Sequence, residues 1–382
     1  MTGGILARFV AVNWRDLKHP DAGGAEVHLH EILRRLAADG HEVTYFVSTF
    51  PGCAEEDHYD GIHVLRSGRW YDANYVIPRR VRAFLGSHPC DLVIEDINKI
   101  PFLLPAFAGP KVVAVVPHLF GGTVFRETNA IFASYVYLWE KLIPLVYRDC
   151  RFVVISPSTK TDLIGRGVRG DRIDVVLCGL DHGVYRVIEG VERFENPTLV
   201  HFGRMRKYKS IEVVIKAFAL VKENLPDARL LIIGDGPERE SLVRLARRMG
   251  LGASVEFPGA VDTPELVTLL NKSHLFLNAS PKEGWGLTVV EANACGLPVI
   301  ASRRPGLQDS VKDGETGHLV EYGDVRGFAA KAIELLADPE KWGRMSLAAV
   351  EWARSFTWDR TGREMKKIFL DEIETNRDTT PR

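Results

Sequence analysis

The chain has 382 residues, a length that predicts two or three domains at roughly 150 residues each. Hydrophobic residues make up 46% of it and charged residues 26%, a composition that excludes a disordered chain, a collagen and a coiled coil. With 49 Lys and Arg against 50 Asp and Glu, the formal net charge is -1, so the chain has no strong field to capture nucleic acid.

The first half of the chain alternates short β-branched runs with longer segments of helical periodicity. Residues 9–12 predict a strand, and residues 25–39 predict a helix that ends before Gly40. Continuous apolar runs, such as VVAVV at 112–116, are typical of parallel strands that are covered on both faces. Further strands are predicted at 43–48, 62–66, 91–95, 152–156 and 173–177. The alternation indicates βαβ units.

The pattern restarts after residues 190–197, a charged linker that ends in Asn-Pro. Two of the helices that follow have a readable start, because Pro237 and Pro264 each predict a first helical position. Long amphipathic helices are predicted at 340–354 and 361–373, before a polar tail. Strands are predicted at 198–202, 229–233, 255–257, 275–278, 299–301 and 318–320.

These elements predict two doubly wound α/β domains of similar size. We place the first domain at residues 1–187 and the second at 188–355, with a terminal helix at 356–376 and a frayed tail at 377–382. In such folds ligands bind beyond the carboxyl ends of the strands. Two such domains face to face would leave a cleft between them.

Several common site patterns are missing from the sequence. No G-x-G-x-x-G follows the first strand, no G-x-x-x-x-G-K-[ST] occurs, and there is no D-x-D pair of the kind that holds a metal-bridged diphosphate. The five cysteines are scattered without a C-x-x-C, which excludes a disulfide framework and a thiolate zinc site and fits a reducing cytosol. His28 and His30 lie two apart on a predicted helix, which favours one surface and one packed histidine over a metal site.

The strongest positive signal is the segment 280–292, SPKEGWGLTVVEA, which passes from a predicted strand through a Gly-rich turn into a helix. The main-chain amides of residues 286–288 would lie at the helix N-terminus, where unsatisfied N–H groups and the helix dipole both favour an anion. Glu283 before the helix and Glu291 inside it could each accept hydrogen bonds from sugar or ribose hydroxyls. The alternative is that Glu283 caps the helix and Glu291 is solvated.

Three further segments follow predicted strands. Residues 203–209 (GRMRKYK) are basic, and Arg and Lys at a strand's carboxyl end can neutralise a diphosphate without a metal; the alternative is a solvated loop. Gly23 and Gly24 precede the first helix and allow a ligand close to the backbone, although a plain strand-to-helix turn fits equally well. His118 follows the VVAVV strand and would point toward the cleft; a structural histidine is the alternative.

These four segments, in this order and spacing, resemble glycosyltransferase family 4, the retaining enzymes of the GT-B fold. The resemblance covers nearly the whole chain, and its most specific part is the family's E-x7-E motif at Glu283 and Glu291. Other collinear segments also match: GGAEVHLHEILRRLAADGHEVTYF, ISPSTKTDLIGRGVRGDRIDVVLCGLD, LIIGDGPERESL and FTWDRTGREMKKIF. The family implies two Rossmann-like doubly wound parallel-sheet domains facing across a cleft, with a C-terminal helix that crosses back to the first domain.

The resemblance also implies roles for single residues. Arg204 and Lys209 would bind the donor diphosphate and stabilise it as the leaving group. Glu291 would hold the ribose hydroxyls, and Glu283 would hold hydroxyls of the donor sugar. His118 would contact that sugar near the reaction centre, which makes it a catalytic candidate together with Glu283, Arg204 and Lys209. The other donor-binding residues would be Gly23, Gly24, Val261, Gly284, Trp285, Gly286, Leu287 and Thr288. No metal and no cofactor are expected.

The implied activity is that of a metal-independent retaining hexosyltransferase (EC 2.4), which moves a hexose from a UDP- or GDP-hexose to a glycan, a lipid carrier or a small molecule. The resemblance implies front-face transfer, in which the leaving phosphate deprotonates the acceptor, rather than double displacement. Spacing alone assigns no carboxylate as a covalent nucleophile. A nucleotide-sugar-binding protein without turnover is the alternative. An epimerase or phosphorylase would need a base for the sugar 2-position or a cofactor-linked lysine, and neither signature is present.

Many relatives in this family act on lipid carriers or growing polysaccharides at the membrane surface. Residues 78–85 mix basic and apolar residues on a short helix, and residues 135–147 are rich in aromatics, which favour interfaces. The alternatives are a solvated basic face and a domain core. We therefore expect a cytoplasmic protein, with peripheral membrane contact at the inner face of the plasma membrane as a second expectation.

Overall fold

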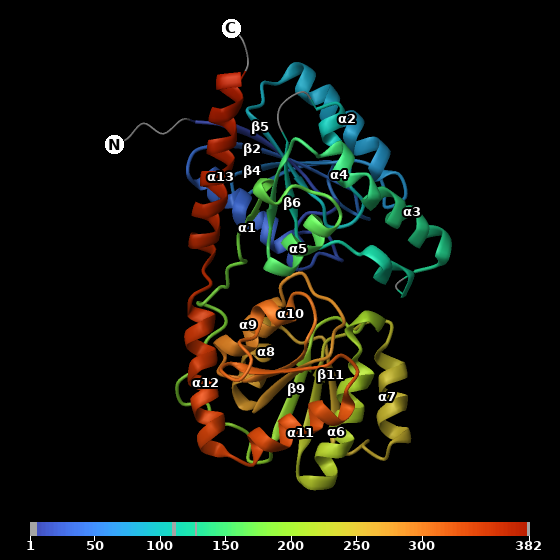
Figure 1. The fold of residues 1–382 in the computed structure, drawn as a ribbon, viewed down its shortest axis with the longest axis vertical. Helices are drawn as coiled ribbons and strands as arrows, with labels where there is room; N and C mark the ends of the chain where they lie inside the picture. Colours follow the sequence, from blue (N-terminus) through green and yellow to red (C-terminus); the bar gives the residue numbers. More distant parts are fainter. Residues whose placement is uncertain (1–5, 109–111, 127, 380–382) are drawn as a thin grey trace. The chain divides into compact units, whose positions relative to one another are not determined.

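The chain folds into two compact units, each built on its own sheet (Figure 1). The computed structural model describes residues 6–108, 112–126 and 128–379. Unit 1 comprises residues 1–179 and 358–382, and unit 2 comprises residues 180–357. The chain therefore passes into unit 2 a few residues before the expected boundary at 187, and it returns to unit 1 at Trp358.

The described strands of unit 1 form an eight-stranded sheet in the order β3-β4-β2-β1-β5-β6-β7-β8. Every neighbouring pair is parallel except β3 and β4. The strand order reverses between β1 and β5, which are direct neighbours, so this is the topological switch point of the unit. The strands are β1 (Arg8–Val12), β2 (Glu42–Val47), β3 (Glu56–Tyr59), β4 (Ile62–Arg66), β5 (Leu92–Asp96), β6 (Val112–Val116), β7 (Arg151–Val154) and β8 (Ile173–Val175).

The antiparallel edge strand β3 is added to the parallel sheet that the sequence predicts, and the strand predictions did not include it. β3 has the polar sequence EDHY, so its hydrophobic pattern gives no strand signal. The turn to β4 is Asp60-Gly61, and both residues have a positive φ, 51° and 75°. A two-residue Asp-Gly turn of this kind matches the twist of a β-hairpin.

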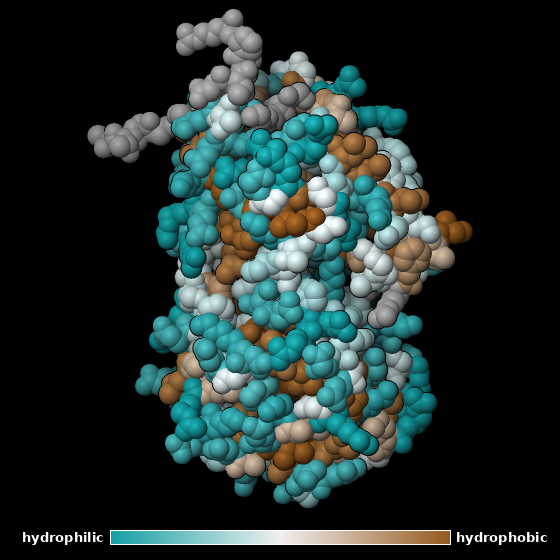
Figure 2. All heavy atoms as spheres, viewed as in Figure 1, coloured by the Kyte–Doolittle hydropathy of each residue, from teal (hydrophilic) through white to brown (hydrophobic). Residues whose placement is uncertain are grey.

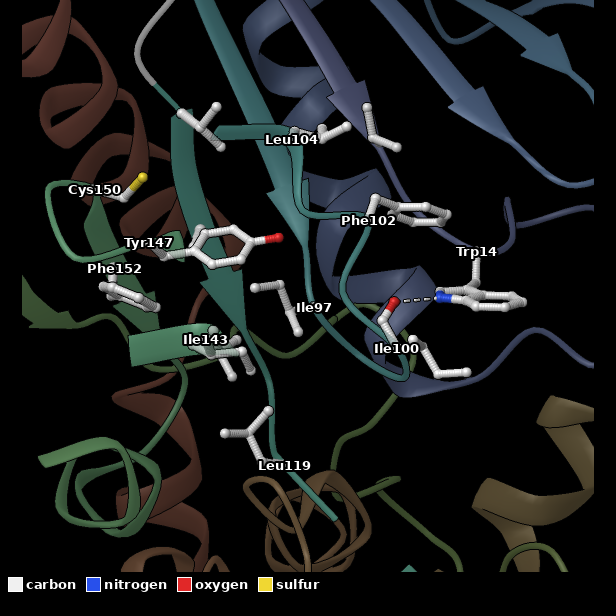
Figure 3. Packing of buried hydrophobic residues seen from close by; sticks show 14 of the residues in the cluster. Trp14, Ile97, Ile100, Phe102, Leu104, Leu119, Ile143, Tyr147, Cys150 and Phe152 are labelled. Carbon is white, nitrogen blue, oxygen red and sulfur yellow. Dashed lines mark hydrogen bonds between the residues drawn. The ribbon is translucent and has the colours of Figure 1, made fainter. Parts of the chain in front are cut away.

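Helices cover both faces of the unit 1 sheet. Phe9 and Ala11 of β1 pack in one core with α1 and α13, while Val10 and Val12 pack in the other with α2 and α3. Figure 3 shows part of this second core, where the Trp14 indole donates a hydrogen bond of 2.9 Å to the Ile100 carbonyl. The helices are α1 (Gly24–Ala38), α2 (Ala73–Ser87), η1 (Leu104–Ala106), η2 (Gly121–Arg126), α3 (Ala130–Lys141), α4 (Ile143–Val146), α5 (Pro157–Gly165), η3 (Gly170–Arg172) and α13 (Trp358–Thr379).

The described strands of unit 2 form a six-stranded parallel sheet in the order β11-β10-β9-β12-β13-β14. Counted from the first strand of the unit this is 3-2-1-4-5-6, the order of dinucleotide-binding Rossmann folds. The switch point lies between β9 and β12, which run side by side. The strands are β9 (Thr198–Phe202), β10 (Arg229–Ile233), β11 (Val255–Gly259), β12 (Leu275–Asn278), β13 (Val299–Ser302) and β14 (Gly317–Val320).

The unit 2 sheet also has a hydrophobic core on each face. Val214 and Phe328 belong to the core under α6 and α11, and Val289 and Leu270 belong to the core under α8 and α9. Pro264 lies in the first turn of α8 as expected, but α7 begins only at Arg239, so the expected start at Pro237 is wrong. The helices are η4 (Lys207–Lys209), α6 (Ile211–Asn224), α7 (Arg239–Arg248), α8 (Thr263–Lys272), α9 (Leu287–Ala294), α10 (Leu307–Ser310), α11 (Val325–Leu336) and α12 (Pro339–Arg354).

The end of the chain returns to unit 1 as the long helix α13. Phe369 of α13 packs against Phe9, and Lys366 forms an ion pair of 2.6 Å with Asp39 at the end of α1. α13 runs to Thr379, so the tail expected from residue 377 begins inside this helix, and residues 380–382 lie outside the described part of the chain. Among the described residues, none of the helices combines the length and the apolar character needed to cross a membrane.

Candidate functional site

The switch point of unit 2 brings together the two loops that follow β9 and β12. Lys209 lies in η4 after β9, and Glu283 lies in the loop after β12. The Lys209 Nζ donates to the Glu283 Oε1 over 2.5 Å, and the two side chains are only 14% and 15% exposed. Residues 74 positions apart therefore form one partly buried ion pair at the place where this fold class binds ligands.

Close backbone packing fixes the loop after β9. The Met205 amide donates to the Asp235 carbonyl over 2.8 Å. A Cβ atom at Gly234 would lie 2.1 Å from the Gly203 carbonyl oxygen, and one at Gly236 would lie 2.4 Å from the Met205 carbonyl oxygen. Both glycines also have a positive φ, so the approach of the two loops requires glycine at each position.

The loop after β12 is held against the loop after β13. The Glu283 amide donates to the Pro305 carbonyl over 3.0 Å, and a Cβ atom at Gly306 would lie 2.3 Å from the Glu283 carbonyl oxygen. Gly286 then ends the loop with a φ of 88° and is the N-cap of α9. These contacts hold Glu283 beside Lys209. The same loop also fixes the position of the first turn of α9.

The start of α9 has the properties of an anion site. Gly286 supplies no side-chain cap, and the first turn contains no acidic residue. The first amides of any helix have no intrahelical partner, and the helix dipole adds positive charge there. The amides of Leu287 and Thr288 belong to this turn, so they can donate to a phosphate.

Electrostatics link Lys209 to both glutamates of the segment 280–292. Burial by itself lowers the pKa of Lys209, but the Glu283 carboxylate outweighs it and the pKa is raised, so the lysine stays charged. Burial raises the pKa of Glu291 to about 7, although a hydrogen bond from Tyr185 and the charge of Lys209 act in the opposite direction. Glu291 is therefore poised to change its charge near neutral pH.

Tyr185 and His201 also belong to this site, and no sequence motif predicted either of them. The Tyr185 phenol hydrogen-bonds to Glu291, and burial followed by the Glu291 charge raises its pKa. His201, inside β9, shares a hydrogen bond of 2.8 Å with the Leu277 carbonyl through Nδ1, and burial lowers its pKa to about 4. A histidine within the apolar run TLVHF was the available signal for His201, whereas nothing local marks Tyr185.

Other predicted residues lie in the same unit as this pair. Arg204 is exposed in the same loop as Lys209, and its positive charge acts to lower the pKa of Lys209. Val261 follows β11 and packs against the core that α9 covers. The Trp285 side chain is 2% exposed and meets Phe356 with ring centroids 5.3 Å apart, so Trp285 offers a ligand its backbone rather than its indole.

The remaining predicted residues lie in unit 1. The Gly23 amide donates to the Glu26 Oε2 over 2.7 Å at the start of α1, so the Glu26 carboxylate occupies the amide before Gly24. His118 follows β6, is half-buried, and meets Phe120 edge-on. The structure thus brings Lys209, Glu283 and Glu291 together within unit 2, while His118 and the two glycines belong to the other unit.

Glu140 supports the loop that carries His118, and the sequence analysis missed it. Its carboxylate accepts the amides of Phe120 (2.7 Å) and Gly121 (2.8 Å) and pairs with Arg166 at 3.0 Å. The side chain is fully enclosed. A lone carboxylate within the apolar helix YVYLWEKL was the signal, because a buried charge needs partners of this kind.

His28 and His30 of unit 1 differ from the expectation of one surface and one packed histidine. His28 and His30 are both buried, so neither is the expected surface histidine. His28 lies against Trp358, and burial lowers its pKa to about 4; His30 pairs with Asp60 at 2.8 Å. In the part of the chain that the structure describes, the cluster with metal-ligand spacing is Glu56, His58 and His63 on the β3–β4 hairpin, apart from all predicted site residues.

Two family models match the chain, one for each unit. Residues 22–184 match a model described as Glycosyltransferase Family 4, and residues 189–352 match a model described as Glycosyl transferases group 1. The two matches together run through nearly all of both sheets.

Curated relatives match about half of the chain. The N-acetyl-alpha-D-glucosaminyl L-malate synthase of Bacillus anthracis is 35% identical over 180 residues, which are 47% of this chain and 46% of that protein. The D-inositol 3-phosphate glycosyltransferase of Thermobispora bispora is 31% identical over 227 residues, which are 55% of this chain and 53% of that protein. The chain thus spans about half the length of the relatives it matches.

Solved structures match the whole chain at lower identity. Sucrose-phosphate synthase from Thermosynechococcus elongatus has a TM-score of 0.80 at 22% identity, over 97% of this chain and 100% of that one. Anabaena Alr3699/HepE in complex with UDP-glucose has a TM-score of 0.73 at 19% identity, over 96% and 100%. At these identities the likeness shows a shared fold, and it confirms the two Rossmann-like units expected from the sequence.

Proposed function

Since the chain belongs to glycosyltransferase family 4 and has the GT-B fold, we propose that it transfers a hexose from a nucleotide-diphosphate sugar held at the switch point of unit 2. The observation that carries this proposal is the Lys209–Glu283 pair at the start of α9. The pair combines a fixed cation, a carboxylate and a helix N-terminus, the groups that a diphosphate joined to a sugar would need. UDP- and GDP-hexoses both fit, and the acceptor is a glycan, a lipid carrier or a small molecule.

Each part of the donor has a matching group in unit 2. Lys209 and Arg204 would neutralise the diphosphate, and the amides at the start of α9 would donate to its oxygens. Glu291 would accept ribose hydroxyls, and Glu283 would accept hydroxyls of the hexose while it positions Lys209. Val261 would lie against the base. The UDP-glucose complex of Anabaena Alr3699/HepE, a protein of the same fold, is compatible with this donor class.

The chemistry asked of these residues is electrostatic. The bond between the anomeric carbon and the phosphate oxygen breaks, and the electron pair leaves with the diphosphate. Fixed cations and helix amides stabilise that charge as it develops, without rearrangement at the moment of reaction. Lys209 and α9 provide the positive charge, so we propose a metal-independent transfer.

We also propose retention by a front-face route. The departing phosphate would take the acceptor proton as the new glycosidic bond forms on the same face. A glycosyl-enzyme adduct trapped by mass spectrometry would instead indicate double displacement. The roles of His118, Gly23 and Gly24 toward the donor stay predictions.

The first test is a thermal-shift panel of UDP, GDP, ADP and TDP with excess EDTA. A nucleotide at ~100 times its dissociation constant stabilises a protein by about 2.7 kcal/mol. One nucleotide should raise the melting temperature of the wild type and of Lys207→Met, an exposed cation of the same loop, but not that of Lys209→Met. No shift with any nucleotide, with or without Mg²⁺, would contradict the proposal. Slow hydrolysis of the matching donor sugar would separate a transferase from a binder.

A specific feature of unit 1 also supports the expected membrane contact, and we propose it for α3 and α4. Ile131, Leu138, Leu142 and Leu145 are exposed, and their spacing places them along one side of this helical segment. Figure 2 shows hydrophobic residues at the edge of the molecule where Figure 1 places α3. An exposed apolar stripe of this kind marks a surface that is covered in use.

An anionic lipid surface is the occupant that the charges favour. Exposed Lys141 ends α3, and exposed Arg79 and Arg82 lie on α2, which joins α3 through a Tyr75–Tyr135 hydrogen bond of 3.2 Å. The wild type should sediment with anionic phosphatidylglycerol vesicles at low salt, and Leu138→Asp should not. Val187→Asp, an exposed apolar position of unit 2, is the control and should sediment. A wild type that stays in the supernatant would contradict this contact.

A further inference from the structure

The β3–β4 hairpin carries three side chains with metal-ligand spacing that neither the donor site nor the membrane contact uses. Glu56, His58 and His63 each offer one ligand atom, and these atoms all lie within 4.8 Å of one another. We call this set the hairpin triad. It lies in unit 1, whereas the Lys209–Glu283 pair lies in unit 2. The expectation of no metal came from motifs for diphosphate and thiolate sites, whose chemistry is different.

The strand register places the triad on one face of the hairpin. β3 and β4 are antiparallel, and His58 lies directly opposite His63. Side chains alternate between the two faces of a strand, so Glu56 lies on the same face as His58. The residues that flank the Asp60-Gly61 turn close it with a hydrogen bond. The next pair, His58 and His63, is therefore a non-hydrogen-bonded pair, whose side chains approach more closely.

The three side chains of the triad are already in contact. The imidazole rings of His58 and His63 stack with their centroids 4.3 Å apart and their planes 6° from parallel. His63 donates from Nε2 to the Glu56 Oε1 over 2.7 Å. The Glu56 and His63 side chains are 62% and 30% exposed, and His58 is exposed as well. An ion can therefore reach all three ligand atoms from solvent.

The opposite face of the hairpin holds β3 in place. Asp57 pairs with Lys18 at 2.8 Å and with Arg66 at 3.2 Å. The Tyr59 hydroxyl donates to the Asp16 Oδ2 over 3.2 Å. These contacts tie β3 to β4 and to the loop after β1, so the register does not depend on the triad. The ligand atoms are held close together before an ion binds, which lowers the ordering cost of binding.

The ligand atoms select the class of ion. Two imidazole nitrogens and one carboxylate oxygen suit Zn²⁺, Ni²⁺ and Cu²⁺, whereas Mg²⁺ and Ca²⁺ prefer oxygen ligands. We propose that the hairpin triad binds a divalent transition-metal ion and that water completes its coordination. The ion would take the place of the His63 Nε2 proton, which would move through solvent to Nδ1 of the same ring.

Metal binding to the full, untagged chain tests the proposal without any turnover. The wild type is stripped with a chelator, dialysed, and titrated with ZnCl₂, NiCl₂ and MgCl₂ by isothermal titration calorimetry. Zn²⁺ and Ni²⁺ should each bind with a stoichiometry of one ion per chain at the triad, and Mg²⁺ should not bind there.

Two variants remove a ligand and keep an aromatic ring on the strand. His58→Phe and His63→Phe should each weaken Zn²⁺ binding at least about tenfold, because even the loss of an outer partner of a metal ligand costs about 10–100-fold in affinity. His88→Phe is the matched control, since His88 is an exposed histidine of unit 1 outside the triad. Circular dichroism without metal checks that each variant folds.

Thermal unfolding gives a second measurement. The ion would bridge β3 and β4 and bind the folded chain, so Zn²⁺ should raise the melting temperature of the wild type and of His88→Phe. The melting temperature of His58→Phe should not rise. The same shift in His58→Phe as in the wild type would contradict a bridge between the two strands.

Three calorimetric results would overturn the proposal. They are no binding of Zn²⁺ or Ni²⁺ to the wild type, equal binding to His58→Phe, and Mg²⁺ binding as tight as that of Zn²⁺. Equal binding to His58→Phe would place the ion elsewhere, for example at a thiol. The donor variant Lys209→Met separates this proposal from the proposed function, because it should keep Zn²⁺ binding. A loss of Zn²⁺ binding in Lys209→Met would contradict the placement of the ion on the hairpin.

Discussion

Both units place an ion pair next to the first strand of their sheet, but the two pairs differ in exposure. In unit 1, Arg66 at the end of β4 donates from Nε to Asp16 in the loop after β1 over 2.8 Å, and these side chains are 1% and 0% exposed. In unit 2, the Lys209–Glu283 pair is 14% and 15% exposed. The first pair can only hold its loop, whereas the second can still exchange a partner. The same chemistry therefore serves structure in one unit and is available to a ligand in the other.

Removing the enclosed pair should give the largest effect. Arg66→Met leaves the Asp16 carboxylate buried without its cation, which costs about 3–5 kcal/mol for pairs of this kind. Urea unfolding measures the change, with Arg8→Met as the control, because Arg8 pairs with Asp91 at a half-exposed position. The two variants should differ by several kcal/mol. Equal losses would show that enclosure does not separate these pairs.

The partly buried pair should affect turnover more than folding. Under the proposed function, Lys209→Met removes a cation from the leaving diphosphate, so it should lower the transfer rate by about 10²–10³, by analogy with single oxyanion-hole donors. That factor corresponds to about 2.7–4 kcal/mol of transition-state stabilisation. Lys207→Met on the same loop should keep the rate within a few-fold. An unchanged rate in Lys209→Met would remove the lysine from the mechanism.

The proposed contact of Glu291 with the donor ribose predicts that donor affinity rises with pH. Burial raises the pKa of its carboxyl to about 7, so the acid is mostly protonated below that pH and mostly a hydroxyl-accepting carboxylate above it. Titrations with a nucleotide sugar, whose phosphates do not titrate in this range, should show about tenfold tighter binding at pH 8 than at pH 6. Glu291→Gln should flatten the profile.

The raised pKa of Glu291 should also make the folded protein less stable as pH rises, the opposite of its effect on donor affinity. The folded protein holds the proton of Glu291 up to about pH 7, while the unfolded chain releases it near the usual value of 4.5. The contribution of Glu291 to stability therefore falls as pH rises between these two values. The free energy of unfolding should fall more over this interval in the wild type than in Glu291→Gln. A smaller fall in the wild type would contradict the raised pKa.

A surface pair extends the series and should matter least. Lys366 on α13 pairs with Asp39, with side chains 33% and 47% exposed. Lys366→Ala should cost under about 1 kcal/mol, since solvent screens such pairs. Phe369→Ala, one turn along the same helix, removes an enclosed ring and should cost about 3–5 kcal/mol. Urea midpoints of the two variants should therefore separate clearly.

The sequence predicts the frame of the molecule better than its details. The strands at 62–66, 112–116 and 198–202 match the structure residue for residue, because buried parallel strands read as continuous or alternating apolar runs. β3 was not predicted because its side chains are polar, although the Asp60-Gly61 pair is a typical hairpin turn. The start of α7 was misplaced because Pro237 belongs to the tight turn that follows β10.

Part of the candidate site lies within one segment of the sequence, and the rest meets only through the fold. Glu283, Glu291 and the start of α9 lie within 13 residues, so their spacing carried the prediction. The contact of Tyr185 with Glu291 depends on a segment about a hundred residues away. Such contacts follow from tertiary packing and cannot be derived from local pattern.

Because Lys209 is bonded to Glu283, the Glu283 carboxylate competes with any other anion for this lysine. Glu283 is a tethered anion, present at a high effective concentration beside the lysine, so a passing chloride or free phosphate must displace it unaided. The proposed nucleotide-sugar donor is different, because its hydroxyls would satisfy the Glu283 carboxylate while its phosphates would bind Lys209. The empty site would thereby discriminate against the abundant small anions of the cell before any donor arrives.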